Sequence, residues 1–147
     1  MRPRSYRVVA LAAMLASCEA PTDPNASRVR LEMGTQSIYA DAMALLESHD
    51  SDSTVIVGHI LFPGSPYSAS ARLQTGPGEW TVVLRAVPLP NCCADVLNTR
   101  AYRLRIAGTL PAGTLLRVVH SYPNTGWAAD TIFERTLAPI ALQRATP

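Results

Sequence analysis

The segment TRAYRLRIA, residues 99–107, decides the fold of this chain. Tyr102, Leu104 and Ile106 alternate with Arg103 and Arg105, so an extended backbone sends the apolar side chains to one side and the arginines to the other. Strict alternation over this length is typical of a strand with one buried and one solvated face. The segment therefore predicts a sheet that covers a core on one side.

Further strands are predicted on both sides of this segment, separated by turns rich in glycine and proline. The expected strands are 28–33, 55–62, 68–75, 79–87, 115–122 and 130–138. The turn Gly76-Pro77-Gly78 joins two of them into a hairpin. Repeated crossover helices are missing from the pattern, which argues against a parallel α/β sheet. We predict an all-β fold, a single antiparallel β-sandwich of six or seven strands.

One stretch is compatible with a short helix. Within residues 37–48, Ile38, Ala42 and Leu45 follow helical spacing, and Ser37 is a suitable N-cap. Alanine-rich composition favours helix over strand. The sequence leaves both states open here, with the helix favoured.

The first seventeen residues have the three-part layout of a secretory signal. Arg2, Arg4 and Arg7 precede an uncharged apolar run over 8–16, and the small residue Ser17 follows. The run is too short to cross a membrane, which takes about 20 helical residues. Its removal leaves ten basic and eleven acidic residues, a net charge of −1. Bulk charge therefore gives no reason to expect a nucleic-acid partner.

The junction Leu15-Ala16-Ser17-Cys18 resembles the lipobox of bacterial lipoproteins, in which an aliphatic and two small residues precede a cysteine. The resemblance implies cleavage before Cys18 and lipid on its thiol, and hence export and anchoring to a bacterial membrane, facing the periplasm or the cell surface. Two or more acyl chains suffice for stable anchoring. We expect a signal peptide, a lipidated flexible tether and a β-sandwich domain. They would span residues 1–17, 18–27 and 28–147, with the core of the domain at about 54–142.

A second resemblance concerns the domain. The stretch LPAGTLLRVVH (110–120), followed by a polar turn and DTIFERTLAP (130–139), is similar to the last two strands of immunoglobulin-like and transthyretin-like sandwich modules of bacterial envelope proteins. The resemblance implies an immunoglobulin-like sandwich and specifies no activity. The disulfide between sheets found in antibody domains has no counterpart, because the two cysteines left once Cys18 is lipidated, Cys92 and Cys93, are adjacent.

Cys92 and Cys93 are adjacent in an expected loop. An oxidising compartment favours pairing of thiols. Neighbouring Cα atoms are about 3.8 Å apart, less than the usual separation of roughly 4.4 to 6.8 Å across a disulfide, so a vicinal bridge would be strained. A vicinal disulfide, two unpaired thiols, a disulfide with another chain, and a ligand, redox or metal role all stay open.

Four arginines on successive predicted strands are candidates for an outward binding patch. They are Arg85, Arg103, Arg105 and Arg117. Such a cluster would recognise carboxylates or phosphates by bidentate hydrogen bonds. The other interpretation is a solvated sheet face balanced by Glu79, Asp95 and Glu134. Separately, Tyr67, Tyr122 and Trp127 fall in or near turns, where they would form a binding rim or pack in the core or at an edge.

No motif selects a catalytic group. The chain has no GxSxG elbow and no phosphate-binding glycine loop, and His49, His59 and His120 share no metal-ligand spacing, although neighbouring strands could bring His59 and His120 together. We predict no catalytic residue, no metal and no cofactor. The first expected function is a non-catalytic envelope module with an envelope protein or glycan as partner. The alternatives are a periplasmic binding protein for a small anionic or carbohydrate ligand, and a hydrolase.

Overall fold

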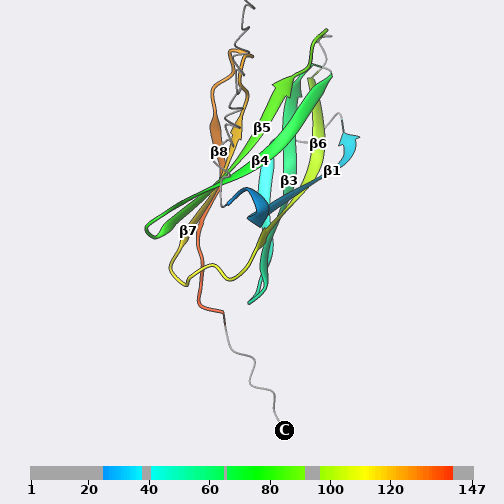
Figure 1. The fold of residues 1–147 in the computed structure, drawn as a ribbon. Helices are drawn as coiled ribbons and strands as arrows, with labels where there is room; N and C mark the ends of the chain where they lie inside the picture. Colours follow the sequence, from blue (N-terminus) through cyan, green and yellow to red (C-terminus); the bar gives the residue numbers. More distant parts are fainter. Residues whose placement is uncertain (1–24, 38–40, 65, 92–96, 141–147) are drawn as a thin grey trace, which may run out of the picture.

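The computed structural model describes residues 25–37, 41–64, 66–91 and 97–140, which form two four-stranded sheets packed face to face (Figure 1). Sheet A has the order β1-β6-β3-β2, and its strands are β1 (Val29–Ser37), β6 (Leu97–Ala107), β3 (Ser53–Pro63) and β2 (Met43–His49). Sheet B has the order β4-β5-β7-β8, and its strands are β4 (Tyr67–Gly76), β5 (Glu79–Pro88), β7 (Leu115–Ser121) and β8 (Asp130–Thr136). The predicted all-β sandwich is confirmed, with eight strands in place of six or seven.

The helix favoured within 37–48 is wrong over the residues that the structure describes there. Residues 38–40 lie outside the described part, and Met43–His49 is strand β2, which pairs antiparallel with β3. Ala44 is 8% exposed and belongs to the core, while its neighbours Met43 and Leu45 point outward. Pairing with β3 and burial of Ala44 outweigh the helix propensity of an alanine-rich segment, which is a weak preference.

One strand pair departs from the expected antiparallel arrangement. β5 and β7 run parallel in sheet B, because the chain between them crosses to sheet A, forms β6 and returns. Parallel neighbours need such a crossover, while the β4–β5 hairpin needs only the turn at Gly76-Pro77-Gly78. Constant-type immunoglobulin domains have seven strands in the order ABED and CFG, and the strand order here differs from it.

A single core lies between the sheets. On β6 the alternation expected from the sequence holds, with Tyr102, Leu104 and Ile106 buried and Arg103 and Arg105 exposed. Sheet B contributes a matching set of inward side chains: Leu73, Val82, Leu84, Ala86, Leu116 and Val118. Burial of these apolar side chains on both inner faces is the main term that holds the layers together.

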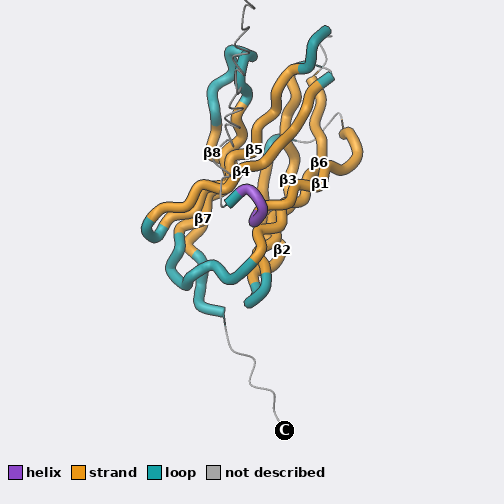
Figure 2. The backbone as a smooth tube through the Cα atoms, viewed as in Figure 1, coloured by secondary structure: helices purple, strands orange, loops and turns teal. Residues whose placement is uncertain are grey.

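The N-terminal end of the described chain is fastened to the sandwich. Of the expected tether 18–27, residues 18–24 lie outside the described part, and the Asn25 side chain donates to Thr75 Oγ1 at 3.2 Å. The 3₁₀ turn Ala26–Arg28, purple in Figure 2, leads into β1. The Arg28 guanidinium lies 4.5 Å from the centroid of the Trp80 ring and donates to the Ala107 carbonyl at 3.2 Å. Asn25 and Arg28 thus join the start of the described chain to the sandwich.

Candidate functional site

The outer face of sheet A carries an apolar groove of about 480 Å³, called the outer groove below. The strand register forms it from two rows of side chains. One row runs Glu32, Arg103, Val57 and Leu45 across β1, β6, β3 and β2. The second row runs Ala101, His59 and Met43. All seven residues line the groove, which therefore crosses the whole sheet.

Small residues and exposed apolar residues together make this groove. Gly34 lies at the bulge of β1, and a Cβ there would come within 3.1 Å of the Ala101 Cβ. Leu45 is 55% exposed and Met43 is 37% exposed on the edge strand β2. A contiguous apolar surface of this kind on a domain marks a binding site more often than a chance patch.

The charges at the rim of the outer groove cancel. Arg103 forms a bidentate ion pair with Glu47. The distances are 3.1 Å from Nη1 to Oε1 and 2.7 Å from Nη2 to Oε2. Because the guanidinium is already engaged by a carboxylate, it offers little to an anionic ligand. The groove suits an apolar occupant.

His59 is the one imidazole in this apolar lining. Its Nδ1 is buried and has no hydrogen-bond partner among the described residues. A buried polar atom without a partner costs free energy unless water or a ligand satisfies it. His59 thus brings an unsatisfied, solvent-inaccessible nitrogen to the groove lining.

The four candidate arginines do not form one patch. Arg103 and Arg105 point outward from β6 in sheet A, whereas Arg85 and Arg117 belong to β5 and β7 in sheet B. Since the inner faces of the sheets meet in the core, these two pairs of arginines lie on opposite sides of the molecule.

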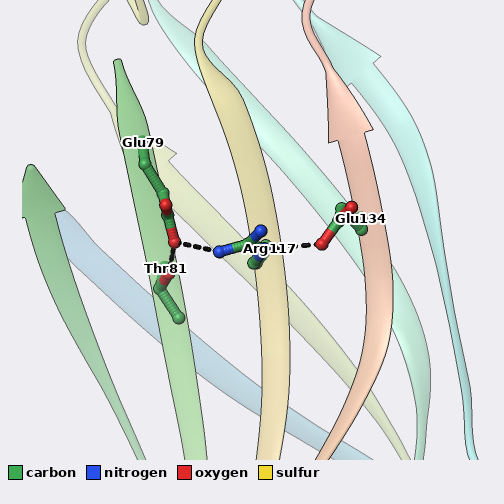
Figure 3. Close-up of polar contacts among 4 residues, drawn as sticks. All are labelled: Glu79, Thr81, Arg117 and Glu134. Carbon is green, nitrogen blue, oxygen red and sulfur yellow. Dashed lines mark hydrogen bonds and ion pairs between the residues drawn. The ribbon is translucent and has the colours of Figure 1, made fainter. Parts of the chain in front are cut away.

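Arg117 is held in a ladder of charges across the outer face of sheet B (Figure 3). Its Nη1 donates to Glu79 on β5 and its Nε donates to Glu134 on β8 at 2.5 Å. Thr81 adds a hydrogen bond to the same Glu79 oxygen at 3.4 Å. The hydrogen bond to Glu134 is the main cause that raises the pKa of Arg117. Both glutamates were named as balancing charges in the sequence, and here they neutralise Arg117.

A polar pair bridges the two sheets inside the core. The Tyr102 hydroxyl on β6 lies 3.1 Å from Nε2 of the fully buried His120 on β7, and 3.4 Å from the Met43 carbonyl. Burial raises the pKa of Tyr102. Burial also lowers the pKa of His120 to about 4, although the nearby negative charge of Asp130 raises it in part. His120 is therefore neutral near pH 7. Its position inside the sandwich places it away from His59, which faces the outer groove.

The turn between β2 and β3 borders a second pocket, of about 690 Å³, against residues 135–140. His49 Nδ1 lies 2.9 Å from Thr54 Oγ1, and Nε2 is buried without a hydrogen-bond partner in the described chain. Asp50 accepts the backbone N–H groups of Asp52 and Ser53, and these bonds lower its pKa. Asp50 thus stabilises the turn.

The expected aromatic rim divides into two places. Tyr67 packs edge-on against Phe62 at 5.3 Å between ring centroids, at the start of β4. Tyr122 and Trp127 lie in the connection from β7 to β8, with their ring centroids 5.3 Å apart. The second pair borders a separate pocket of about 390 Å³.

The candidate cysteines Cys18, Cys92 and Cys93 lie outside the described residues. Within the described ranges, no group of three or more His, Cys, Asp or Glu side chains is arranged to hold a metal ion. No helix in the described part of the chain is long and apolar enough to span a membrane.

Sequence reasoning missed the outer groove. Met43 and Leu45 were assigned to a helix, so their place on a sheet face was lost. One signal was available in VIVGHILF, residues 55–62, which is apolar at consecutive positions and thus on both faces of β3. Such a run indicates that the outer face of its sheet is covered or available for binding.

Comparisons with protein-family models, with curated proteins and with solved structures found no match to this chain. The fold and the groove therefore define the class by themselves: a β-sandwich domain with an apolar groove on one outer face.

Proposed function

We propose that this chain is an exported bacterial lipoprotein, anchored through lipid on Cys18, whose β-sandwich is a non-catalytic interaction module. The outer groove is the observation that carries the role of the module. Its apolar lining favours an apolar segment of an envelope protein as the partner. Among the described residues that line the outer groove, none is a nucleophile paired with His59, so we assign no reaction to the groove.

The proposal of a small anionic ligand loses its main support. Arg103 and Arg117 are each paired with glutamate, and the four arginines are divided between opposite faces. An apolar partner at the outer groove needs none of them. The interaction module is accordingly preferred over an anion-binding protein.

Anchoring is tested by intact mass of the protein extracted from membranes, beside Cys18→Ala. The expected result is a mass that includes acyl chains and starts at Cys18 for the unaltered protein, and no acyl mass for the variant. Acylation that survives the substitution would remove the anchor from the proposal.

Partner binding is tested with a photo-crosslinking residue at Leu45 in living cells. Leu97 is the matched control, because it is 56% exposed, close to the 55% of Leu45, and does not line the outer groove. We expect one recurring envelope protein to be captured from position 45, and its capture to be lost when Val57→Glu is added. Equal capture from both positions, or none from position 45, contradicts the module's role.

A further inference from the structure

The pocket beside Trp127 has the composition of a sugar site. It measures about 390 Å³ and is lined by Tyr122, Trp127, Asp130 and the aliphatic side chains of Leu61 and Ile132. Trp127 is 40% exposed, so much of its indole is open to solvent. Pockets that bind small molecules begin at roughly 300 Å³ and combine apolar walls with few polar groups. We call this the aromatic pocket.

The connection that presents Trp127 is ordered by its own hydrogen bonds. Thr125 Oγ1 donates to the Tyr122 carbonyl at 2.7 Å and accepts the Trp127 backbone N–H at 3.1 Å. Asn124 and Gly126 adopt positive φ angles of 65° and 77°, which tight turns use. The rings of Tyr122 and Trp127 meet edge to face at 66°. The indole is thereby positioned before any ligand binds, which lowers the entropy cost of binding.

Tyr122 fixes the base of the pocket. It is 6% exposed, and the backbone of Leu61 on β3 hydrogen-bonds to its hydroxyl. Burial raises its pKa to about 12, so the hydroxyl is un-ionised at neutral pH. The aromatic support of Trp127 is therefore tied to both sheets.

Asp130 gives the pocket a carboxylate with open acceptor sites. It begins β8 and is exposed, and no hydrogen bond or ion pair joins its side chain to another described residue. A carboxylate accepts two hydroxyl donors at once, and hydrogen bonds to a charged acceptor are about twice as strong as neutral ones. Two neighbouring hydroxyl groups of a sugar match this geometry.

We propose that the aromatic pocket binds a neutral pyranose unit, with its C–H face stacked on Trp127 and two vicinal hydroxyls donating to Asp130. The C–H groups of a pyranose carry partial positive charge, and the face of an aromatic ring is negative. An acidic sugar is disfavoured, because its carboxylate would approach Asp130. This site is separate from the outer groove and does not depend on the partner proposed there.

Isothermal titration of the purified chain tests the site. The probes are cellotetraose, maltotetraose and tetra-N-acetylchitotetraose, with tetragalacturonate as the acidic counterpart. At least one neutral probe is expected to bind with a Kd on the order of 0.1–1 mM, with no binding of the acidic probe. Trp127→Ala should weaken binding by at least about tenfold, Trp127→Phe by less than about threefold, and Asp130→Asn by about tenfold.

Trp80→Phe and Leu45→Glu are the controls, since Trp80 is the other tryptophan and Leu45 lies in the outer groove. Both should leave sugar binding unchanged, and circular dichroism should show that every variant is folded. Absence of binding by all three neutral probes at about 10 mM overturns the proposal. Equal affinity of the unaltered chain and a folded Trp127→Ala variant overturns it as well.

Discussion

Gly58 is a residue whose missing side chain the core requires. It lies on β3 opposite Tyr102 on β6, and a Cβ at this position would come within 2.6 Å of the Tyr102 hydroxyl and 2.1 Å of the Met43 carbonyl. The tyrosine can reach across β3 to His120 and to β2 only over a glycine. Gly58 thus makes the polar bridge between the sheets possible.

Gly58→Ala is therefore expected to destabilise the fold. The added methyl group forces Tyr102 or β2 to move, and overpacking of this kind costs about 2 to 3 kcal/mol. Urea unfolding at pH 7 measures the change. Gly76→Ala is the matched control, because the nearest atom to its Cβ would be 3.6 Å away, and we expect a change within about 0.5 kcal/mol. Equal effects of the two substitutions would contradict the packing argument.

His120 should make stability depend on pH. Burial lowers its pKa to about 4 in the folded state, against 6.5 for an ordinary histidine. Between these values the unfolded chain binds a proton that the folded chain excludes, so stability is complete above pH 6.5 and falls as the pH is lowered to about 4. The loss over this window is about 3 kcal/mol.

The groups that face His120 set the control for this experiment. They are the neutral Tyr102 hydroxyl and the Asp130 carboxylate on β8, whose charge favours the protonated imidazole. His120→Gln keeps a polar group beside Tyr102 and cannot gain the proton. Urea unfolding from pH 7 to pH 4 should show a much smaller slope in this variant, and identical slopes would show that other groups govern the acid sensitivity.

At the scale of elements, β7 is joined to both of its neighbours through Arg117. The ladder Glu79, Arg117 and Glu134 follows the register of the parallel β5–β7 pair and the antiparallel β7–β8 pair. Side-chain exposures of 32%, 43% and 51% for Arg117, Glu79 and Glu134 mean that water screens these contacts. Such pairs contribute modestly to stability.

Arg117→Met should modestly lower the thermal stability at low ionic strength, because it removes two screened ion pairs and leaves two carboxylates close together. Added salt should reduce the loss, since it screens the remaining glutamates. Arg85→Met is the control on the same face of sheet B, where no ion pair with a described residue is lost. Thermal unfolding at low and high salt provides the readout; a loss that salt leaves unaltered would point to packing of the arginine stem.

The strands with alternating side chains were predictable from the sequence, and the site was not. Residues 99–107 show their two faces directly, and the glycine turn at 76–78 marks its hairpin. β2 was not recognisable, because its alanine and leucine spacing fits a helix and only pairing with β3 settles it. The separation of Arg103 from Arg117 depends on which sheet each strand joins, and alternation within a strand carries no such information.

At the scale of the whole molecule, the two outer faces differ although they cover one core. Sheet A presents the apolar groove, whereas sheet B presents the ladder around Arg117. Under the proposed function, the apolar face binds the partner and the charged face stays in contact with water. The aromatic pocket lies at neither face, because its lining comes from both Leu61 on β3 and Ile132 on β8.

Hydrogen exchange should reveal the same organisation in the backbone. β3 and β6 are paired on both sides in sheet A, as are β5 and β7 in sheet B, whereas β1, β2, β4 and β8 are edges. Amides of the four central strands should exchange slowest, close to the rate set by global unfolding, because opening them requires disruption of the core.

β2 should exchange fastest among the strands of sheet A, since it is short, exposes Met43 and Leu45, and is interrupted by a bulge after Leu46. Mass spectrometry of peptic fragments measures these rates in the isolated protein. Protection of β2 as strong as that of β3 would mean that a second molecule already covers this edge. The Leu45→Glu substitution should then restore fast exchange of β2 in the same measurement.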